Sequence, residues 1–182
     1  MRQANPIKSN RYYEPALICL NGHILNIFGE SKSEHNSEYC PRCGEATVSR
    51  CPACGALIRG CYHVRDENGW LGSWDRCTEK NYHLPLHCHH CGSPYPWTAA
   101  RLETAAQLVN SVPDLTAQKK QQLTAQLSDL LQETPRTAWA TLIFHNALKT
   151  APPIVAAGLR EIILPIAAPI VQRLLCDEQE KK

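Results

Sequence analysis

Paired cysteines constrain this chain more than any other feature of its sequence. Nine of its ten cysteines lie between Cys19 and Cys91, and only Cys176 lies outside that stretch. Three pairs repeat the pattern C-x2-C-G, and a fourth pair joins a cysteine to a histidine four residues later. A zinc ion takes four tetrahedral ligands, and one such knuckle supplies two of them from a single bend of the backbone. Four knuckles therefore predict two structural zinc sites, with the ligands Cys19, His23, Cys40, Cys43, Cys51, Cys54, Cys88 and Cys91.

The pairing of the knuckles has two possible forms. In sequential pairing, the knuckles within 19–43 hold one ion and those within 51–91 hold the other, so that each unit is a zinc ribbon. In crossed pairing, as in RING domains, the first and third knuckles share one ion and the second and fourth share the other. RING domains usually place their second and third ligand pairs only a few residues apart, whereas seven residues separate Cys43 from Cys51 here. The spacing favours two sequential ribbons.

The remaining cysteines and histidines of this region have irregular spacing. Cys61, Cys77 and His83 are candidates for a third metal site, and the alternative is a small buried cysteine with solvated loop histidines. A nucleophilic cysteine needs a base and a third group that orients the base, and the sequence identifies no such third group. We therefore expect no enzymatic activity, no catalytic residue and no small-molecule substrate.

Compartment and charge limit the classes of partner. The start of the sequence, MRQANPIKSN, lacks the apolar core of a secretory signal, so we expect a cytoplasmic protein whose paired cysteines hold metal. The net charge of the chain is +2. With two zinc ions bound, the thiolates bring the N-terminal half to about −2. A protein that binds nucleic acid by neutralising phosphates needs the opposite sign.

The composition changes after Trp97, from Cys, His, Gly and short alternating runs to Ala, Leu, Gln and Lys at helical spacing. We expect an N-terminal extension over 1–14, a small zinc-stabilised β region of two tandem zinc ribbons over 15–97, and an all-α region of about four helices over 98–182. Alternation at 46–50 and 56–59 predicts strands in the ribbons.

The all-α region carries clear signals for helix starts. Thr98 is a candidate N-cap. An apolar residue precedes it and another lies one turn into the helix, which is the arrangement of a hydrophobic staple. A second helix is expected from about 116 to 131. A third begins after Thr134, because the proline that follows suits the first helical position.

The last apolar segment, 153–176, keeps a helical period through Pro165 and Pro169, which predicts one kinked helix. At roughly 36 Å it would be long enough to cross a bilayer. Arg160 and Glu161 interrupt it, however, and its apolar stripe is one-sided. We favour a buried or partner-facing helix over a membrane-surface or membrane-spanning one.

Several motifs together resemble a bacterial family of short double-zinc-ribbon proteins catalogued as a domain of unknown function. They are ICLNGH at 18–23, YCPRCG at 39–44, CPACGALIRGCYHV at 51–64, CHHCGSPYPWT at 88–98 and TPRTAWA at 134–140. The resemblance runs from about Tyr13 to the C-terminus, apart from 65–86. It implies a bacterial, cytosolic, two-zinc protein with a helical tail, and it implies no reaction.

Three functions fit these features. The first is a non-enzymatic adaptor, whose helical tail docks a protein partner or a second copy. Its candidate interface anchors are Trp70, Trp74, Tyr82, Tyr95 and Trp97. The alternative is that these aromatic side chains cover a small core. The second is a nucleic-acid-binding protein that uses Arg42, Arg50, Arg59 and Arg65. The third is a membrane-directed effector that uses the helix at 153–176. We favour the adaptor.

Overall fold

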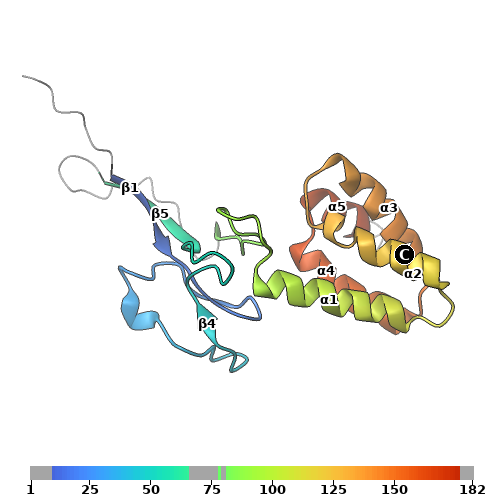
Figure 1. Cartoon of the computed structure of the whole chain (residues 1–182), viewed down its shortest axis with the longest axis horizontal. Helices are drawn as coiled ribbons and strands as arrows, with labels where there is room; N and C mark the ends of the chain where they lie inside the picture. Colours follow the sequence, from blue (N-terminus) through green and yellow to red (C-terminus); the bar gives the residue numbers. More distant parts are fainter. Residues whose placement is uncertain (1–9, 66–77, 79–80, 177–182) are drawn as a thin grey trace, which may run out of the picture. The chain divides into compact units, whose positions relative to one another are not determined.

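A computed structural model describes residues 10–65, 78 and 81–176 of the chain (Figure 1). The chain divides into two compact units, Met1–Trp97 and Thr98–Lys182. We call the first the β unit and the second the helical unit. Small sheets with cysteine clusters followed by helices are the fold class that the sequence predicts.

The described residues of the β unit form two small antiparallel sheets. One pairs β1 with β5, and the other has the order β3-β2-β4. Their bounds are β1 Asn10–Pro15, β2 Leu17–Cys19, β3 Ile24–Asn26, β4 Thr47–Val48 and β5 Arg59–Arg65. Two predictions for this unit, one of an extension and one of a strand, need correction. Residues 10–14 are no extension, because β1 forms a ladder with β5. The strand predicted at 56–59 begins instead at Arg59.

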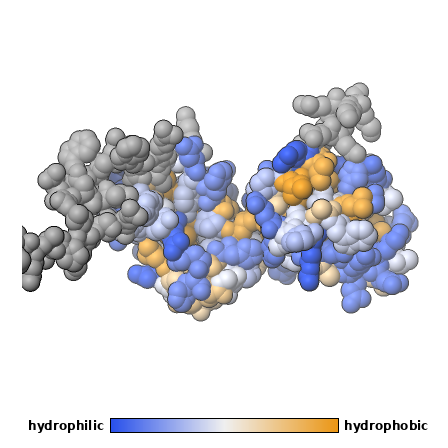
Figure 2. Space-filling model, turned by 90° about the horizontal axis from the view of Figure 1, so that it is seen from above, coloured by the Kyte–Doolittle hydropathy of each residue, from blue (hydrophilic) through white to orange (hydrophobic). Residues whose placement is uncertain are grey.

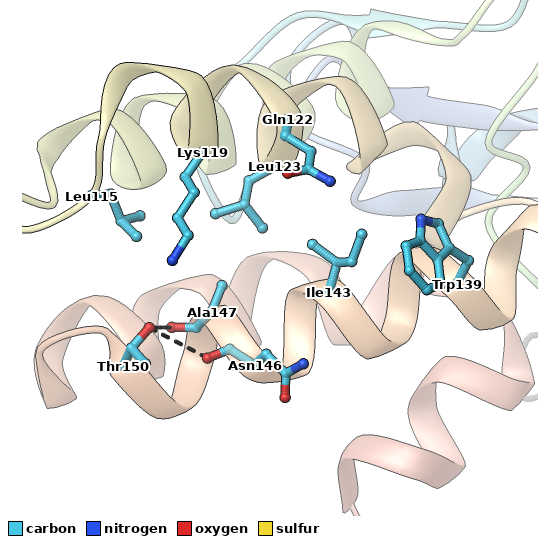
Figure 3. Close-up of a pocket in the computed structure, with 9 residues that line it drawn as sticks. All are labelled: Leu115, Lys119, Gln122, Leu123, Trp139, Ile143, Asn146, Ala147 and Thr150. Carbon is cyan, nitrogen blue, oxygen red and sulfur yellow. Dashed lines mark hydrogen bonds between the residues drawn. The ribbon is translucent and has the colours of Figure 1, made fainter.

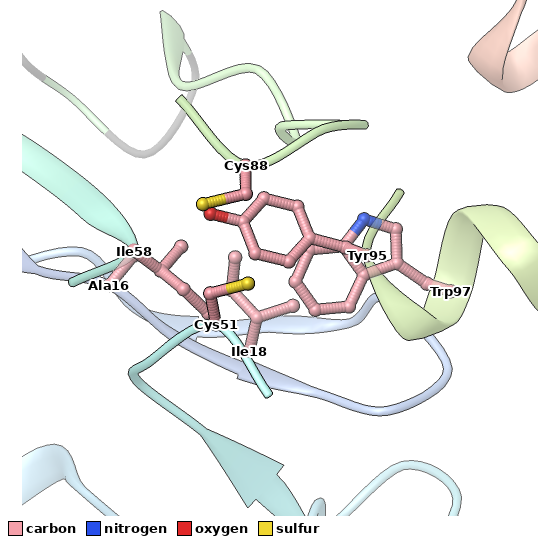
Figure 4. Packing of buried hydrophobic residues seen from close by; sticks show 7 residues of the cluster. All are labelled: Ala16, Ile18, Cys51, Ile58, Cys88, Tyr95 and Trp97. Carbon is pink, nitrogen blue, oxygen red and sulfur yellow. The ribbon is translucent and has the colours of Figure 1, made fainter. Parts of the chain in front are cut away.

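A shared apolar core joins the two halves of the β unit (Figure 4). Ala16 and Ile18 come from the segment before the first knuckle, whereas the other members lie between the third knuckle and the start of α1 (Pro96–Ser111). These other members are Cys51, Ile58, Cys88, Tyr95 and Trp97. The two predicted ribbons therefore pack together and are not separate folding units.

The aromatic side chains at the end of the β unit belong to this core. Tyr95 and Trp97 are fully buried and stack with ring centroids 4.7 Å apart. The indole N–H of Trp97 donates to the Pro85 carbonyl at 2.8 Å. The interpretation of these two residues as interface anchors is wrong, because no surface is left for a partner. Tyr82 is half-buried and its hydroxyl donates to the Arg59 carbonyl, while Trp70 and Trp74 lie outside the described residues.

A buried carboxylate ties a loop to β1. Glu14 is 1% exposed and accepts hydrogen bonds from the backbone N–H groups of Glu30 and Ser31 at 3.1 and 2.9 Å, and from the Ser31 hydroxyl. Its other contact is His63 of β5, with 2.5 Å between Oε1 and Nε2. Buried charges persist only when such partners compensate them. Glu14 thus fixes the loop that follows β3 onto the β1–β5 ladder.

In the helical unit as far as Cys176, α1 is followed by four further helices and two short 3-10 turns. They are α2 Ala117–Gln126, η3 Ser128–Leu130, α3 Pro135–Thr150, α4 Pro153–Ile163, η4 Leu164–Ile166 and α5 Pro169–Cys176. Buried side chains from all five helices include Val109, Leu123, Phe144, Ile163 and Val171. Thr134 caps α3 as predicted, in a capping box with Thr137. The predicted cap at Thr98 is wrong, because α1 begins two residues earlier at Pro96, which suits a first helical turn.

The segment 153–176 is two helices and not one kinked helix. After α4, Pro165 lies in η4 and Ala167 takes an extended conformation, with ψ near 152°. The N–H of Ala168 then donates to the Leu130 carbonyl in η3, outside its own helix. Pro169 opens α5, where its missing N–H costs nothing. Among the residues described, none of the helices combines the length and the apolar character that a membrane crossing needs.

Candidate metal centres

The three C-x2-C-G knuckles have the same backbone structure. In each, the first cysteine N–H donates to the carbonyl five residues on, and the glycine N–H donates back to the first cysteine carbonyl, all at 2.8 to 2.9 Å. A single β-bridge closes each knuckle, as in the pair Tyr39 and Ala46. The three glycines, Gly44, Gly55 and Gly92, have φ between 71° and 73°, a conformation that favours glycine. The knuckle is thus a local structure that its own sequence specifies.

The Cys19–His23 knuckle is tied into the core. Cys19 and His23 share hydrogen bonds across the turn, and Gly22 at its tip has φ of 87°. A Cβ on Gly22 would meet the Trp97 Cβ at 3.0 Å, whereas the glycines of the other knuckles face open space. Gly22 therefore serves both the turn and the close approach of Trp97.

The structure brings the eight predicted ligands together in two groups of four. The first centre is Cys19, His23, Cys40 and Cys43, and the second centre is Cys51, Cys54, Cys88 and Cys91. In each centre all ligand atoms lie within 4.8 Å of one another. The grouping follows the order of the chain, as sequential pairing predicts, and the crossed arrangement of RING domains is absent from these eight residues.

The ligand atoms of each centre converge on one point. In the first centre, His23 Nδ1 lies 3.4 Å from Cys19 Sγ and 3.5 Å from Cys40 Sγ, and the sulfurs of Cys19 and Cys43 are 3.8 Å apart. In the second centre the cross-knuckle sulfur distances are 3.9 Å and 3.7 Å. Both centres have the dimensions of a metal coordination sphere.

Burial alternates within the C-x2-C knuckles. Cys40, Cys51 and Cys88, which open them, are buried, while the second cysteine of each is exposed. Each knuckle is therefore anchored in the protein by its first thiol and reaches solvent with its second. The buried thiols of Cys51 and Cys88 are also members of the shared core.

Backbone N–H groups favour the thiolate form of several ligands. The N–H groups of Cys91 and His90 lower the pKa of Cys88 to about 6. The N–H of Glu45 contributes most to lowering the pKa of Cys43, also to about 6. A thiolate is the form of cysteine that binds metal. Not every ligand is favoured in this way: despite the Ala56 N–H, desolvation and the neighbouring thiols raise the pKa of Cys54 to about 12, and burial raises the pKa of Cys19.

The third metal site that Cys61, Cys77 and His83 would form has no support among the residues described. Cys61 is buried in β5 and belongs to neither centre, and His83 is exposed. Cys77 lies outside the described residues. The buried Glu14–His63 contact was missed in the sequence, because a strand pairing between distant segments creates it and no local pattern marks it.

Comparison with known proteins identifies the family. A family model described as an uncharacterized protein conserved in bacteria (DUF2321) matches residues 12–175, so the chain belongs to this family. The resemblance found in the sequence is thereby confirmed. No curated protein and no solved structure matches the chain.

Proposed function

We propose that this member of a bacterial family is a non-enzymatic interaction protein, in which two structural zinc ions hold the β unit and the helical unit docks a partner protein. The single observation that carries the proposal is the composition of the two centres. Each offers four ligands from the protein itself, in a three-thiolate, one-imidazole set and a four-thiolate set. Such sets are typical of structural zinc.

The dimensions of the centres support zinc in particular. A tetrahedral ion with Zn–S bonds of about 2.3 Å places its sulfurs about 3.8 Å apart. The sulfur distances in both centres, 3.7 to 3.9 Å, agree with that value. Thiolate and imidazole ligands also favour zinc over magnesium or calcium, which take oxygen ligands.

The full ligand sets argue for a structural and not a catalytic ion. A catalytic zinc keeps one position open for water or substrate, usually with three protein ligands. In each centre a fourth protein ligand fills that position. A reducing compartment keeps these thiols available for metal, so we infer a cytoplasmic protein.

The helical unit supplies the surface for a partner. Figure 2 shows apolar side chains among polar ones on one face of this unit. Trp139 on α3 is 59% exposed, and Leu142 on the same helix and Ile154 on α4 are also exposed. Large aromatic residues on a surface are the side chains that most often dominate the energy of a protein interface.

Elemental analysis of the purified chain tests the metal part of this proposal. We expect two zinc ions per chain, because eight ligands form two complete tetrahedra. One ion or three would contradict the ligand assignment.

For the partner, affinity capture from the native host should retain a protein with the wild type and lose it with a Trp139→Ala, Leu142→Ala double variant that keeps both ions.

Nucleic-acid binding is a second candidate, which a face of the β1–β5 ladder favours. Tyr13 and Tyr62 are partly exposed and their ring centroids are 4.8 Å apart, while the Arg59 guanidinium lies 4.7 Å above the Tyr13 ring. Adjacent aromatic rings with a cation are a stacking surface for single-stranded nucleic acid. A salt-dependent mobility shift that Tyr62→Ala weakens would support this function, and no shift at low salt would exclude it.

A further inference from the structure

We propose that the groove between α2 and α3 binds an acidic amphipathic helix of a partner protein. This inference deepens the proposed function and rests on it. The groove has a volume of about 400 Å³ and is open along the two helices (Figure 3). Its centre is formed by Leu123 of α2 and Ile143 of α3, and Trp139 stands at one end.

The length of the groove fits three turns of a helix. Its lining residues on α3 run from Trp139 to Thr150, which is roughly 16 Å of helix. A helix of that length presents apolar side chains at i, i+3 or i+4, and i+7 along one face. The described part of the helical unit contains helices and no strand, so a partner segment has no sheet edge to extend there.

Charge determines the character of the partner helix. Lys119 is the only charged residue among the described residues that line the groove, and Figure 3 shows its side chain reaching from α2 toward α3. Among the residues described, its ammonium group has no ion pair. A carboxylate on the partner at this point would gain a charge-assisted contact beside an apolar surface.

The two helices that form the groove contain basic residues and no acidic ones. They carry Lys119, Lys120, Arg136 and Lys149, and neither contains an aspartate or glutamate. The carboxylates of Asp114, Asp129 and Glu133 lie in the connecting segments and do not line the groove. At Lys119 a helix with basic flanks would meet a like charge, whereas one with acidic flanks is complementary.

A displayed library of amphipathic helical peptides tests the inference with the full-length, zinc-loaded chain. Every member has an apolar stripe of Leu, Ile, Phe or Met, and its flanking positions are drawn at random from Glu, Lys and Gln. We expect selection to enrich Glu over Lys at the flanks. The enriched peptide should then bind at least tenfold more weakly to Trp139→Ala and to Lys119→Glu.

A matched pair of variants provides the control. Gln122 lines the groove and Gln121, its neighbour on α2, does not. Gln122→Glu should weaken the acidic peptide about threefold, and Gln121→Glu, which adds the same charge one position away, should leave the affinity unchanged. Each variant is first checked for its metal content and far-UV circular dichroism, so that a loss of binding reports on the groove and not on folding.

Several results would overturn the inference. They are no enrichment, enrichment of Lys, or an affinity that Trp139→Ala and Lys119→Glu leave unchanged. Self-association in sedimentation that Lys119→Glu abolishes would assign the groove to a second copy instead. A host partner that binds the Trp139→Ala variant with the same affinity as the wild type would refute the assignment of the groove but not the proposed function. The absence of any host partner would refute the proposed function itself.

Discussion

The longest strand of the β unit, β5, has seven residues, while α1 and α3 each have 16. A small core cluster of the β unit has seven members, and two of them are metal-ligand candidates. The helical unit buries aliphatic and aromatic side chains from all five of its helices. From this difference we expect the β unit to need metal to remain folded and the helical unit to stay folded by its own core.

Removal of metal should have the largest effect and should separate the two units. Zinc contributes folding free energy of order 10 kcal/mol in small sites. We expect a strong chelator to unfold the β unit of the intact chain and to leave most of the far-UV helical signal. Hydrogen exchange should then show amides of residues 10–65 unprotected and those of α3 protected. Loss of protection in both units would show that they unfold as one.

Single-ligand variants should affect one centre more than the other. Cys19→Ser removes a ligand of the first centre, and the cobalt-loaded variant should keep the four-thiolate spectrum of the second centre. Cys88→Ser removes a ligand that is also a member of the shared core, so it should also weaken metal binding at the first centre. Cobalt titrations monitored by thiolate-to-metal absorption measure both effects.

The matched control for these variants is Cys61→Ala, which alters a buried cysteine outside both centres and should retain two ions. Equal damage to both centres by Cys19→Ser would contradict the order of effects expected here.

Loss of the buried carboxylate should have an intermediate effect. Glu14→Gln removes the charge that accepts hydrogen bonds from Glu30 and Ser31, at a cost of about 1–3 kcal/mol near pH 7. Glu34→Gln, at an exposed carboxylate, should change stability little. Thermal unfolding of the zinc-loaded variants provides the measurement, and equal melting temperatures for Glu14→Gln and wild type would be the contrary result.

The same variant predicts a pH dependence. Burial by itself raises the pKa of Glu14, but the hydrogen bonds from Ser31 and Glu30 and the charge of His63 lower it below its ordinary value of 4.5. A carboxyl group whose pKa is lower in the folded than in the unfolded state stabilises the native state. This contribution is complete above the unfolded-state pKa and is lost as the pH falls through the folded-state pKa. The advantage of wild type over Glu14→Gln should therefore shrink as the pH falls below about 4.5. Both proteins have the same metal centres, so acid release of metal cancels in the difference.

The cap of α3 should have the smallest effect. Thr134→Ala removes the side-chain oxygen that accepts from the Arg136 N–H and should cost about 1 kcal/mol in the helical unit. Thr150→Ala, at the other end of the same helix, should cost less, because that hydroxyl only bonds carbonyls of its own helix. Denaturant unfolding after chelation isolates this difference, and no change for Thr134→Ala would show that the capping box contributes nothing.

Sequence reasoning succeeded where structure is local. The knuckle turns, their glycines and the cap at Thr134 depend on residues within a few positions of each other, so their spacing reveals them. It failed where distant segments meet. The pairing of β1 with β5 and the contact of Glu14 with His63 join residues about 50 positions apart, and no local pattern records them. The break after α4 was also not predicted, because the apolar spacing continues through Pro165. The backbone there leaves the helical conformation and forms a hydrogen bond with η3.

The pairing of β1 with β5 has a consequence for the order of events during synthesis on the ribosome. All ligands of the first centre are outside the ribosome once Cys43 leaves the exit tunnel. The residue that pairs with Asn10 in the β1–β5 ladder, however, is Arg65, which emerges much later. The second centre must wait longer still, until Cys91 emerges. The four ligands of the first centre can therefore come together on a nascent chain whose N-terminal strand is still unpaired, and contacts between distant residues close last.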